Sequence, residues 1–196
     1  MRDSRYARRD MRVLYFCVTA CTLAAVQALA AAPAAPAIAI EAQPLTHTRE
    51  GRVQGCGLRL TGGEPGTPAS SWFDVSFNVF ARGTGIAQSF AYEIKRSEGY
   101  EGDSRPAKVP VRSTWVRAGE GSTRRGENTE PRDSLVYTLL VEDVLALFEA
   151  VAQSRAVTLG VRRWGQPSDA VYSGTPVISE ESRTEVSACL GRLELE

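Results

Sequence analysis

Hydrophobic and polar side chains alternate most clearly over residues 72–81 of the chain. Phe73, Val75, Phe77 and Val79 fall on one side of this stretch, and mostly polar residues fall on the other. A repeat of two residues is typical of a strand with one buried face. The glycine-containing connector at residues 82–85 then predicts a hairpin into a second strand over residues 86–95.

Further strands are predicted over residues 52–60, 109–117, 135–141, 156–164 and 170–178. Pro110 lacks an amide hydrogen, so we expect the strand over residues 109–117 at a sheet edge or at its own beginning. The polar segments 96–108 and 118–133 can bury little apolar surface. We therefore expect both to be exposed, mobile loops.

Two helices are predicted in the C-terminal half of the chain. Over residues 142–153 the apolar side chains recur at helical spacing. Ser179 is a good N-cap for the second helix, whose inward face would carry Val186, Cys189, Leu190 and Leu193. The pattern predicts an α+β fold, with a mostly antiparallel β-sheet of about seven strands and two helices packed on it.

Residues 1–30 are predicted to be a cleaved export signal. Arginines precede an apolar stretch over residues 13–26, and Ala28 and Ala30 supply small residues before the cleavage point. Translation could start at Met1 or at Met11. Residues 18–21 also allow a lipoprotein, with lipid on Cys21, but the apolar run continues past Cys21 and favours the cleaved form. We expect a periplasmic or secreted protein with no transmembrane segment after signal removal.

Signal removal changes both the charge and the cysteine content. It takes away five arginines and two aspartates, so the formal net charge falls from +0 to −3. A mildly acidic domain without a basic stripe is a poor partner for nucleic acid. Residues 31–45, rich in Ala and Pro, are predicted to be a flexible leader, and residues 46–196 a single domain. Cys56 and Cys189 remain as the one pair, and an oxidising compartment predicts a disulfide between them.

The sequence offers little catalytic chemistry. His47 is the only histidine, expected in a solvated loop, and one histidine excludes most zinc sites and most nucleophiles that need an imidazole base. No catalytic residue, metal site or cofactor is predicted. Asp74 and Glu93, on adjacent predicted strands, could form the outward carboxylate pair of a glycan hydrolase, although such charges are common on half-solvated sheets.

Arginines and tryptophans supply the candidate interaction residues. An arginine beside an aromatic ring can stack on it and grip an anion or a partner carboxylate, although solvated arginines and packed tryptophans fit the same pattern. The candidates are Trp115, Arg124, Arg125, Arg162, Arg163 and Trp164. The leading hypothesis is an exported, non-catalytic bacterial periplasmic binding or protein-interaction domain, with an envelope protein as its partner. The alternatives are a carboxylate-based envelope glycan hydrolase and a small apolar-ligand carrier.

Overall fold

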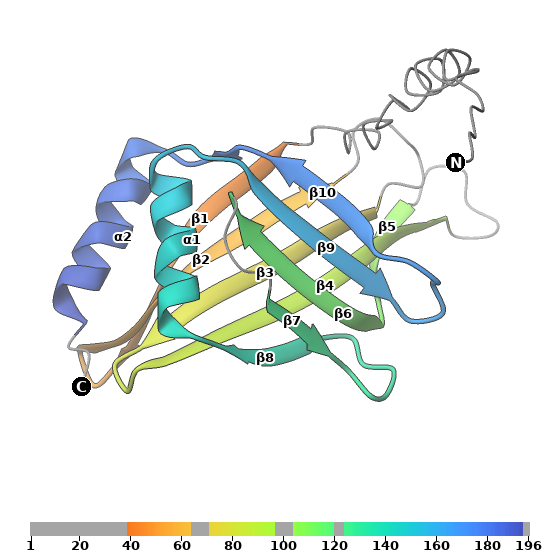
Figure 1. Cartoon of the computed structure of the whole chain (residues 1–196), viewed down its shortest axis with the longest axis horizontal. Coiled ribbons are helices and arrows are strands. Elements are labelled where there is room, and N and C mark those ends of the chain that lie inside the picture. The colour runs from red at the N-terminus through yellow and green to blue at the C-terminus, as the bar shows by residue number, and fades with distance from the viewer. Residues whose placement is uncertain (1–38, 64–70, 97–103, 120–123, 194–196) are drawn as a thin grey trace, which may run out of the picture. The chain divides into compact units, whose positions relative to one another are not determined.

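The computed structural model describes residues 39–63, 71–96, 104–119 and 124–193, which belong to one compact unit (Figure 1). The predicted export signal over residues 1–30, including Cys21, lies outside the described residues, as does the leader from residue 31 to residue 38. No helix in the described ranges is long and apolar enough to cross a membrane.

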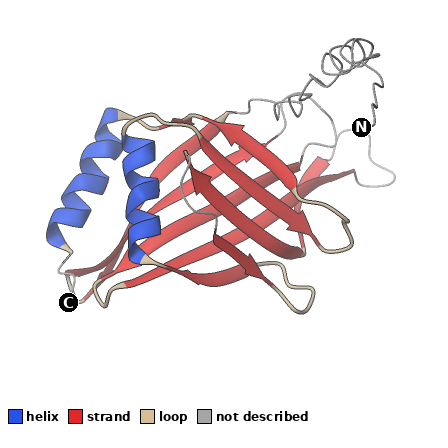
Figure 2. Ribbon diagram, viewed as in Figure 1, coloured by secondary structure: helices blue, strands red, loops and turns tan. Residues whose placement is uncertain are grey.

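The described residues form two sheets and two helices (Figures 1 and 2). The larger sheet has the order β11 (Pro176–Val177), β1 (Ile40–Arg49), β2 (Arg52–Gly63), β3 (Ser71–Phe80), β4 (Thr84–Arg96) and β5 (Ser104–Val109), and β8 (Leu135–Leu139) also pairs with β4. The second sheet has the order β10 (Ala170–Gly174), β9 (Val157–Arg163), β6 (Val111–Ala118) and β7 (Arg124–Glu127). The helices are α1 (Val141–Ala152) and α2 (Glu180–Arg192). All strand pairs are antiparallel except that between β1 and β11.

The strand content differs from the prediction of about seven strands in one sheet. Strand β1 begins at Ile40, so the last residues of the predicted leader belong to the sheet. Pro110 divides the strand expected over residues 109–117 into β5, at an edge of the larger sheet, and β6, which lies between β9 and β7. The two segments expected as loops contribute β5 and β7, while residues 97–103 and 120–123 lie outside the described ranges.

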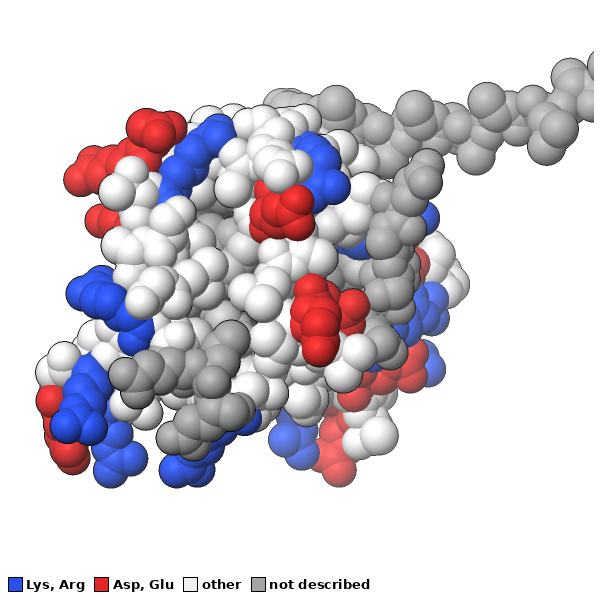
Figure 3. Space-filling view, turned by 60° about the vertical axis from the view of Figure 1, so that its left-hand side comes forward, with Lys and Arg blue, Asp and Glu red and all other residues white. Residues whose placement is uncertain are grey.

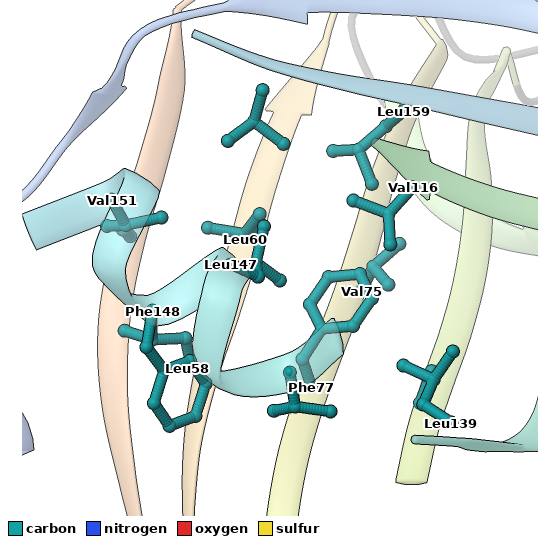
Figure 4. Packing of buried hydrophobic residues seen from close by; sticks show 14 of the residues in the cluster. Leu58, Leu60, Val75, Phe77, Val116, Leu139, Leu147, Phe148, Val151 and Leu159 are labelled. Atoms are coloured by element: carbon teal, nitrogen blue, oxygen red, sulfur yellow. The ribbon is translucent and has the colours of Figure 1, made fainter. Parts of the chain in front are cut away.

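The hydrophobic core lies between the two sheets and beneath the helices. The alternation predicted for residues 72–81 is confirmed, because the inward side chains of β3 are completely buried. In Figure 4, side chains from the larger sheet meet others from α1 and from the second sheet. These include Leu58, Leu60, Val75 and Phe77 of the larger sheet, Leu147, Phe148 and Val151 of α1, and Val116 and Leu159 of the second sheet.

The C-terminal helix is tied to the larger sheet. Ser179 is its N-cap, as predicted, and the Ser179 Oγ accepts a hydrogen bond from the amide of Ser182 at 3.1 Å. Cys56 in β2 and Cys189 in α2 lie at disulfide distance, with an S–S separation of 2.06 Å, which confirms the predicted pairing. Because the two cysteines are 133 residues apart, this bond joins the first part of the domain to its last helix.

Candidate functional site

Three of the six candidate interaction residues converge on one carboxylate. The Trp115 Nε1–H donates to Oδ2 of Asp169 at 2.7 Å, and the Arg162 Nε–H donates to Oδ1 at 2.7 Å. Arg125 donates to Asp169 Oδ2 as well. Neighbouring strands present these donors, since Trp115 in β6 pairs with Arg125 in β7 and β9 follows on the other side. We call Trp115, Arg125, Arg162 and Asp169 the Asp169 cluster.

A glycine makes room for the tryptophan of this cluster. Gly160 in β9 pairs with Trp115, and a Cβ atom at Gly160 would lie only 2.1 Å from the indole ring. The ring therefore lies across the glycine backbone, which brings its N–H within reach of Asp169. An isolated glycine within a strand often marks such a close approach, and this was the signal in the sequence that could have located the site.

The environment of Asp169 favours its charged form. Burial, the largest influence, would by itself raise the pKa of Asp169, since its side chain is only 13% exposed. The hydrogen bonds from Trp115 and Arg162 and the positive charges of Arg125 and Arg162 together outweigh burial and lower the pKa. Asp169 is thus an acceptor that holds three donors in place on the outer face of the second sheet.

The same outer face carries further basic and aromatic side chains. Trp164, directly after β9, is 37% exposed, and the guanidinium of Arg112 lies 5.7 Å from its ring centroid. Arg117 is exposed and lies two residues after Trp115 in β6, so the two side chains share one face. Arginines therefore outnumber the acids that the described residues place here, Asp169 and Glu127. This set defines the basic-aromatic face, which comprises the Asp169 cluster with Arg112, Arg117 and Trp164.

Arg163 and Arg124, the remaining two candidates, are not among the residues of the cluster. Arg163 points to the opposite side of β9 and forms an ion pair with Glu93 of β4, which links the two sheets. Arg124 is the first residue of β7, and its side chain lies outside the described part of the structure. Strand alternation thus separates Arg162 from Arg163, because it sends neighbouring side chains to opposite faces.

A small polar hollow of about 250 Å³ lies near the end of β9, where the two sheets approach each other. Its lining includes Arg163, Asp169 and Ser71, whose hydroxyl lies 3.2 Å from that of Tyr172 in β10. A glycan hydrolase needs a carboxylic acid with a raised pKa. The pKa of Asp169 is lowered instead, so this hollow does not favour glycan hydrolysis.

The carboxylate pair considered from the sequence is not formed. The register pairs Asp74 with Phe90 and Ser71 with Glu93, which places Asp74 and Glu93 on opposite faces of the larger sheet. Asp74 accepts two hydrogen bonds from Arg59, at 2.8 and 2.6 Å, whereas Glu93 pairs with Arg163. The expectation that both acids share the outward face is therefore wrong.

His47 is also placed differently from the prediction. It lies in β1 rather than in a solvated loop, and its Nε2–H donates to Oδ1 of Asn78 at 2.7 Å. Its ring packs 5.3 Å from that of Phe80. The hydrogen bond and ring contact account for this histidine as a part of the sheet surface.

Neither a metal site among the described residues nor a matching relative assigns a function to this surface. Within the described ranges, no group of three His, Cys, Asp or Glu side chains is arranged to hold a metal ion. No protein-family model matches this chain, and no curated protein matches it in sequence. Function is therefore inferred from the side chains and their geometry.

Proposed function

We propose that the protein is an exported, non-catalytic domain of the bacterial envelope that binds another envelope protein through its basic-aromatic face. The observation that carries this proposal is the gathering of Trp115, Arg125 and Arg162 around Asp169 on an outer sheet face. Trp164 and Arg112 extend the same surface. Tryptophan and arginine are the residue types most enriched at the energetic centres of protein interfaces.

The Asp169 cluster would prepare this face for binding. A long arginine side chain loses conformational freedom when a partner immobilises it, and that loss weakens association. Asp169 already restrains Arg125 and Arg162 in the free protein. The excess of arginines over acids favours a partner surface that carries carboxylates, because complementary charge speeds encounter and excludes wrong partners.

The export assignment has independent support. The segment at residues 1–30 has the order of a signal peptide: basic residues, an apolar run and small residues. A disulfide between Cys56 and Cys189 suits a protein that matures in an oxidising space such as the periplasm. The charge of the mature chain gives no reason to expect nucleic acid as the partner.

Site-specific photo-crosslinking in intact cells tests this function. A photoreactive amino acid at Trp164 should give a defined adduct with an envelope protein. The same probe at Val177, which is 67% exposed in β11 of the larger sheet, should not give that adduct. Arg117→Glu should reduce the Trp164 adduct severalfold, whereas Arg52→Glu, an equivalent charge reversal at the start of β2, should leave it unchanged.

Two results would contradict the proposal. One is an adduct of equal yield from Trp164 and Val177, which would indicate contact without a preferred face. The other is an adduct at Trp164 that survives Arg117→Glu unchanged, because the charge of this face would then play no part. Deletion of residues 118–133 is a poor test, since it would remove β7 and the Gly126 backbone on which the Tyr137 ring packs.

A further inference from the structure

Strand β1 has an edge that other strands leave largely uncovered. It pairs with β2 from Ile40 to Arg49, but its other edge pairs only with β11, at Ile40 and Glu41. From Ala42 onward no strand of the described chain lies on that edge. An uncovered edge presents backbone N–H and C=O groups to any extended chain that approaches it.

Pro44 indicates which backbone groups point outward. A proline has no amide hydrogen and is accommodated inside a paired strand when its nitrogen faces away from the neighbouring strand. Pro44 lies within the β1–β2 ladder opposite Leu58, so we infer that its nitrogen faces the open edge. In an antiparallel ladder this direction alternates from residue to residue. The amide and carbonyl of Thr46, two residues on, therefore also face the open edge.

Helix α2 forms the second wall of a groove at this edge. The groove has a volume of about 730 Å³ and is lined by Pro44, Thr46 and Thr48 of β1 and by Glu181, Thr184, Glu185, Ala188 and Arg192 of α2. The helix follows directly from β11, beside the start of β1, and its Cys189 is bonded to Cys56, which pairs with Thr46. It thus runs alongside β1. At the usual rise per residue the helix is about 20 Å long and the uncovered part of β1, residues 42–49, is about 26 Å long.

The groove has a different charge at each end. Glu181 and Glu185 are exposed on the first two turns of α2, and Arg192 is its last residue. The helix dipole accounts for an acid in the first turn and a base in the last. It does not account for Glu185, which lies beyond the first turn, where the effect of the dipole has fallen off. Figure 3 shows the α2 side of the molecule, where both acidic and basic side chains lie among uncharged ones.

We propose that this groove binds an extended peptide segment of a partner protein, which adds to β1 as a strand. The peptide carries a basic side chain next to Glu181 and Glu185 and an acidic group next to Arg192. Backbone hydrogen bonds supply affinity in this mode of recognition, and the side chains along the groove supply specificity. The site goes beyond the proposed function, because it lies on the larger sheet and shares no residue with the basic-aromatic face.

A selection from random octapeptides displayed on phage, with the folded oxidised protein as bait, tests the groove. We expect enriched peptides to combine β-branched residues at alternate positions with Lys or Arg toward one end and Asp or Glu toward the other. A fluorescein-labelled enriched peptide is then measured by fluorescence anisotropy. Ala188→Tyr, which fills the groove from an exposed helix position, should weaken binding at least tenfold, and Ser187→Tyr, on the adjacent exposed position, should not.

Variants of the β1 backbone and of the groove charges distinguish strand addition from binding that uses no backbone hydrogen bonds. Thr46→Pro removes the outward amide and should weaken binding at least tenfold, whereas Thr46→Val keeps the amide and should bind normally. Glu185→Lys should shift the selected peptides from basic to acidic residues at that end. Circular dichroism of each variant shows whether it is folded.

Three outcomes would overturn the proposal: no enrichment, equal binding by Ala188→Tyr and Ser187→Tyr, or equal binding by Thr46→Pro and Thr46→Val. A concentration-dependent dimer that Thr46→Pro abolishes would identify a second copy of this chain as the occupant and would also overturn it. None of these outcomes bears on the crosslinking at Trp164, so this inference and the proposed function fail separately.

Discussion

Replacement of Asp169 by alanine should destabilise the domain by about 3 kcal/mol. The substitution leaves the Trp115 Nε1–H and the Arg162 Nε–H without their acceptor, at sites where Asp169 is 13% and Arg162 24% exposed. Hydrogen bonds to a charged group are worth about 1.5–3 kcal/mol each, and partial exposure places these two toward the lower limit. Arg125, at 36% exposure, adds less than about 1 kcal/mol because water replaces its partner.

Urea unfolding measures this loss. With a slope of about 2 kcal/mol per molar urea, a loss of about 3 kcal/mol lowers the midpoint by about 1.5 M. Tryptophan fluorescence reports Trp115 of the cluster together with Trp72 and Trp164, and circular dichroism follows the whole domain. Arg125→Ala is the matched control, with an expected shift below about 0.5 M. If Asp169→Ala costs no more than Arg125→Ala, the two shielded hydrogen bonds contribute little and the argument is wrong.

The pH dependence provides a second check on the same carboxylate. The pKa of Asp169 is lower in the folded protein than in the unfolded chain, where an aspartate has a pKa of about 3.9. The unfolded state therefore binds the proton first, and the stabilisation, complete above pH ~4, is lost as the pH falls through the folded pKa. Asp169→Asn should lack this part of the acid-induced loss. A variant with the same acid profile as the wild type would show that Asp169 is not the titrating group.

Three further predictions concern single features of the fold. Gly160→Ala should displace the indole ring and lower the free energy of unfolding in urea by about 1–3 kcal/mol. Gly191→Ala, at an open position in α2, should raise the free energy of unfolding by up to about 1 kcal/mol. Equal effects of the two substitutions would contradict the close approach of Trp115 to Gly160. Reduction of the Cys56–Cys189 bond should lower the free energy of unfolding by up to about 5 kcal/mol, which is the chain-entropy value for a loop of 133 residues. An unchanged midpoint of urea unfolding in the presence of reductant would refute this prediction. Burial raises the pKa of Tyr137, whose buried hydroxyl has no hydrogen-bond partner among the described residues. Stability should therefore be lost as the pH rises above about 10, the unfolded value. The pKa of Tyr92 is raised as well, so Tyr137→Phe should remove only the Tyr137 part of this loss, without cost at pH 7. A variant that is destabilised at pH 7 would reveal a partner for the hydroxyl.

Local patterns predicted the elements that local interactions specify. The β3–β4 hairpin follows from alternation and a glycine turn, and the start of α2 follows from Ser179 as its N-cap. The pairing of Cys56 with Cys189 was predicted from an oxidising compartment and from the number of cysteines left after signal removal, rather than from geometry. Each of these features depends on neighbouring residues or on elimination, so a single sequence was sufficient.

Strand register and sheet partners could not be predicted in the same way. Strand β1 shows little hydrophobic alternation after Ala42, because every side chain there is at least partly exposed, and its strand conformation depends on pairing with β2. The faces of Asp74 and Glu93 depend on a register in which a shift of one residue reverses every side chain. The Asp169 cluster depends on the pairing of β6 with β7 and β9, which strand patterns alone do not specify.

The disulfide gives the two proposed binding surfaces different sensitivities to reduction. It joins α2 to β2, the neighbour of β1, so it holds one wall of the groove against the sheet that forms the other. The Asp169 cluster is assembled by β6, β7, β9 and the residue directly before β10, none of which contains a cysteine. Mild reduction in a protein that stays folded should therefore weaken peptide binding at the groove while leaving tryptophan fluorescence and the Trp164 crosslink unchanged. Equal loss at both surfaces would mean that the disulfide supports the whole domain rather than the position of α2.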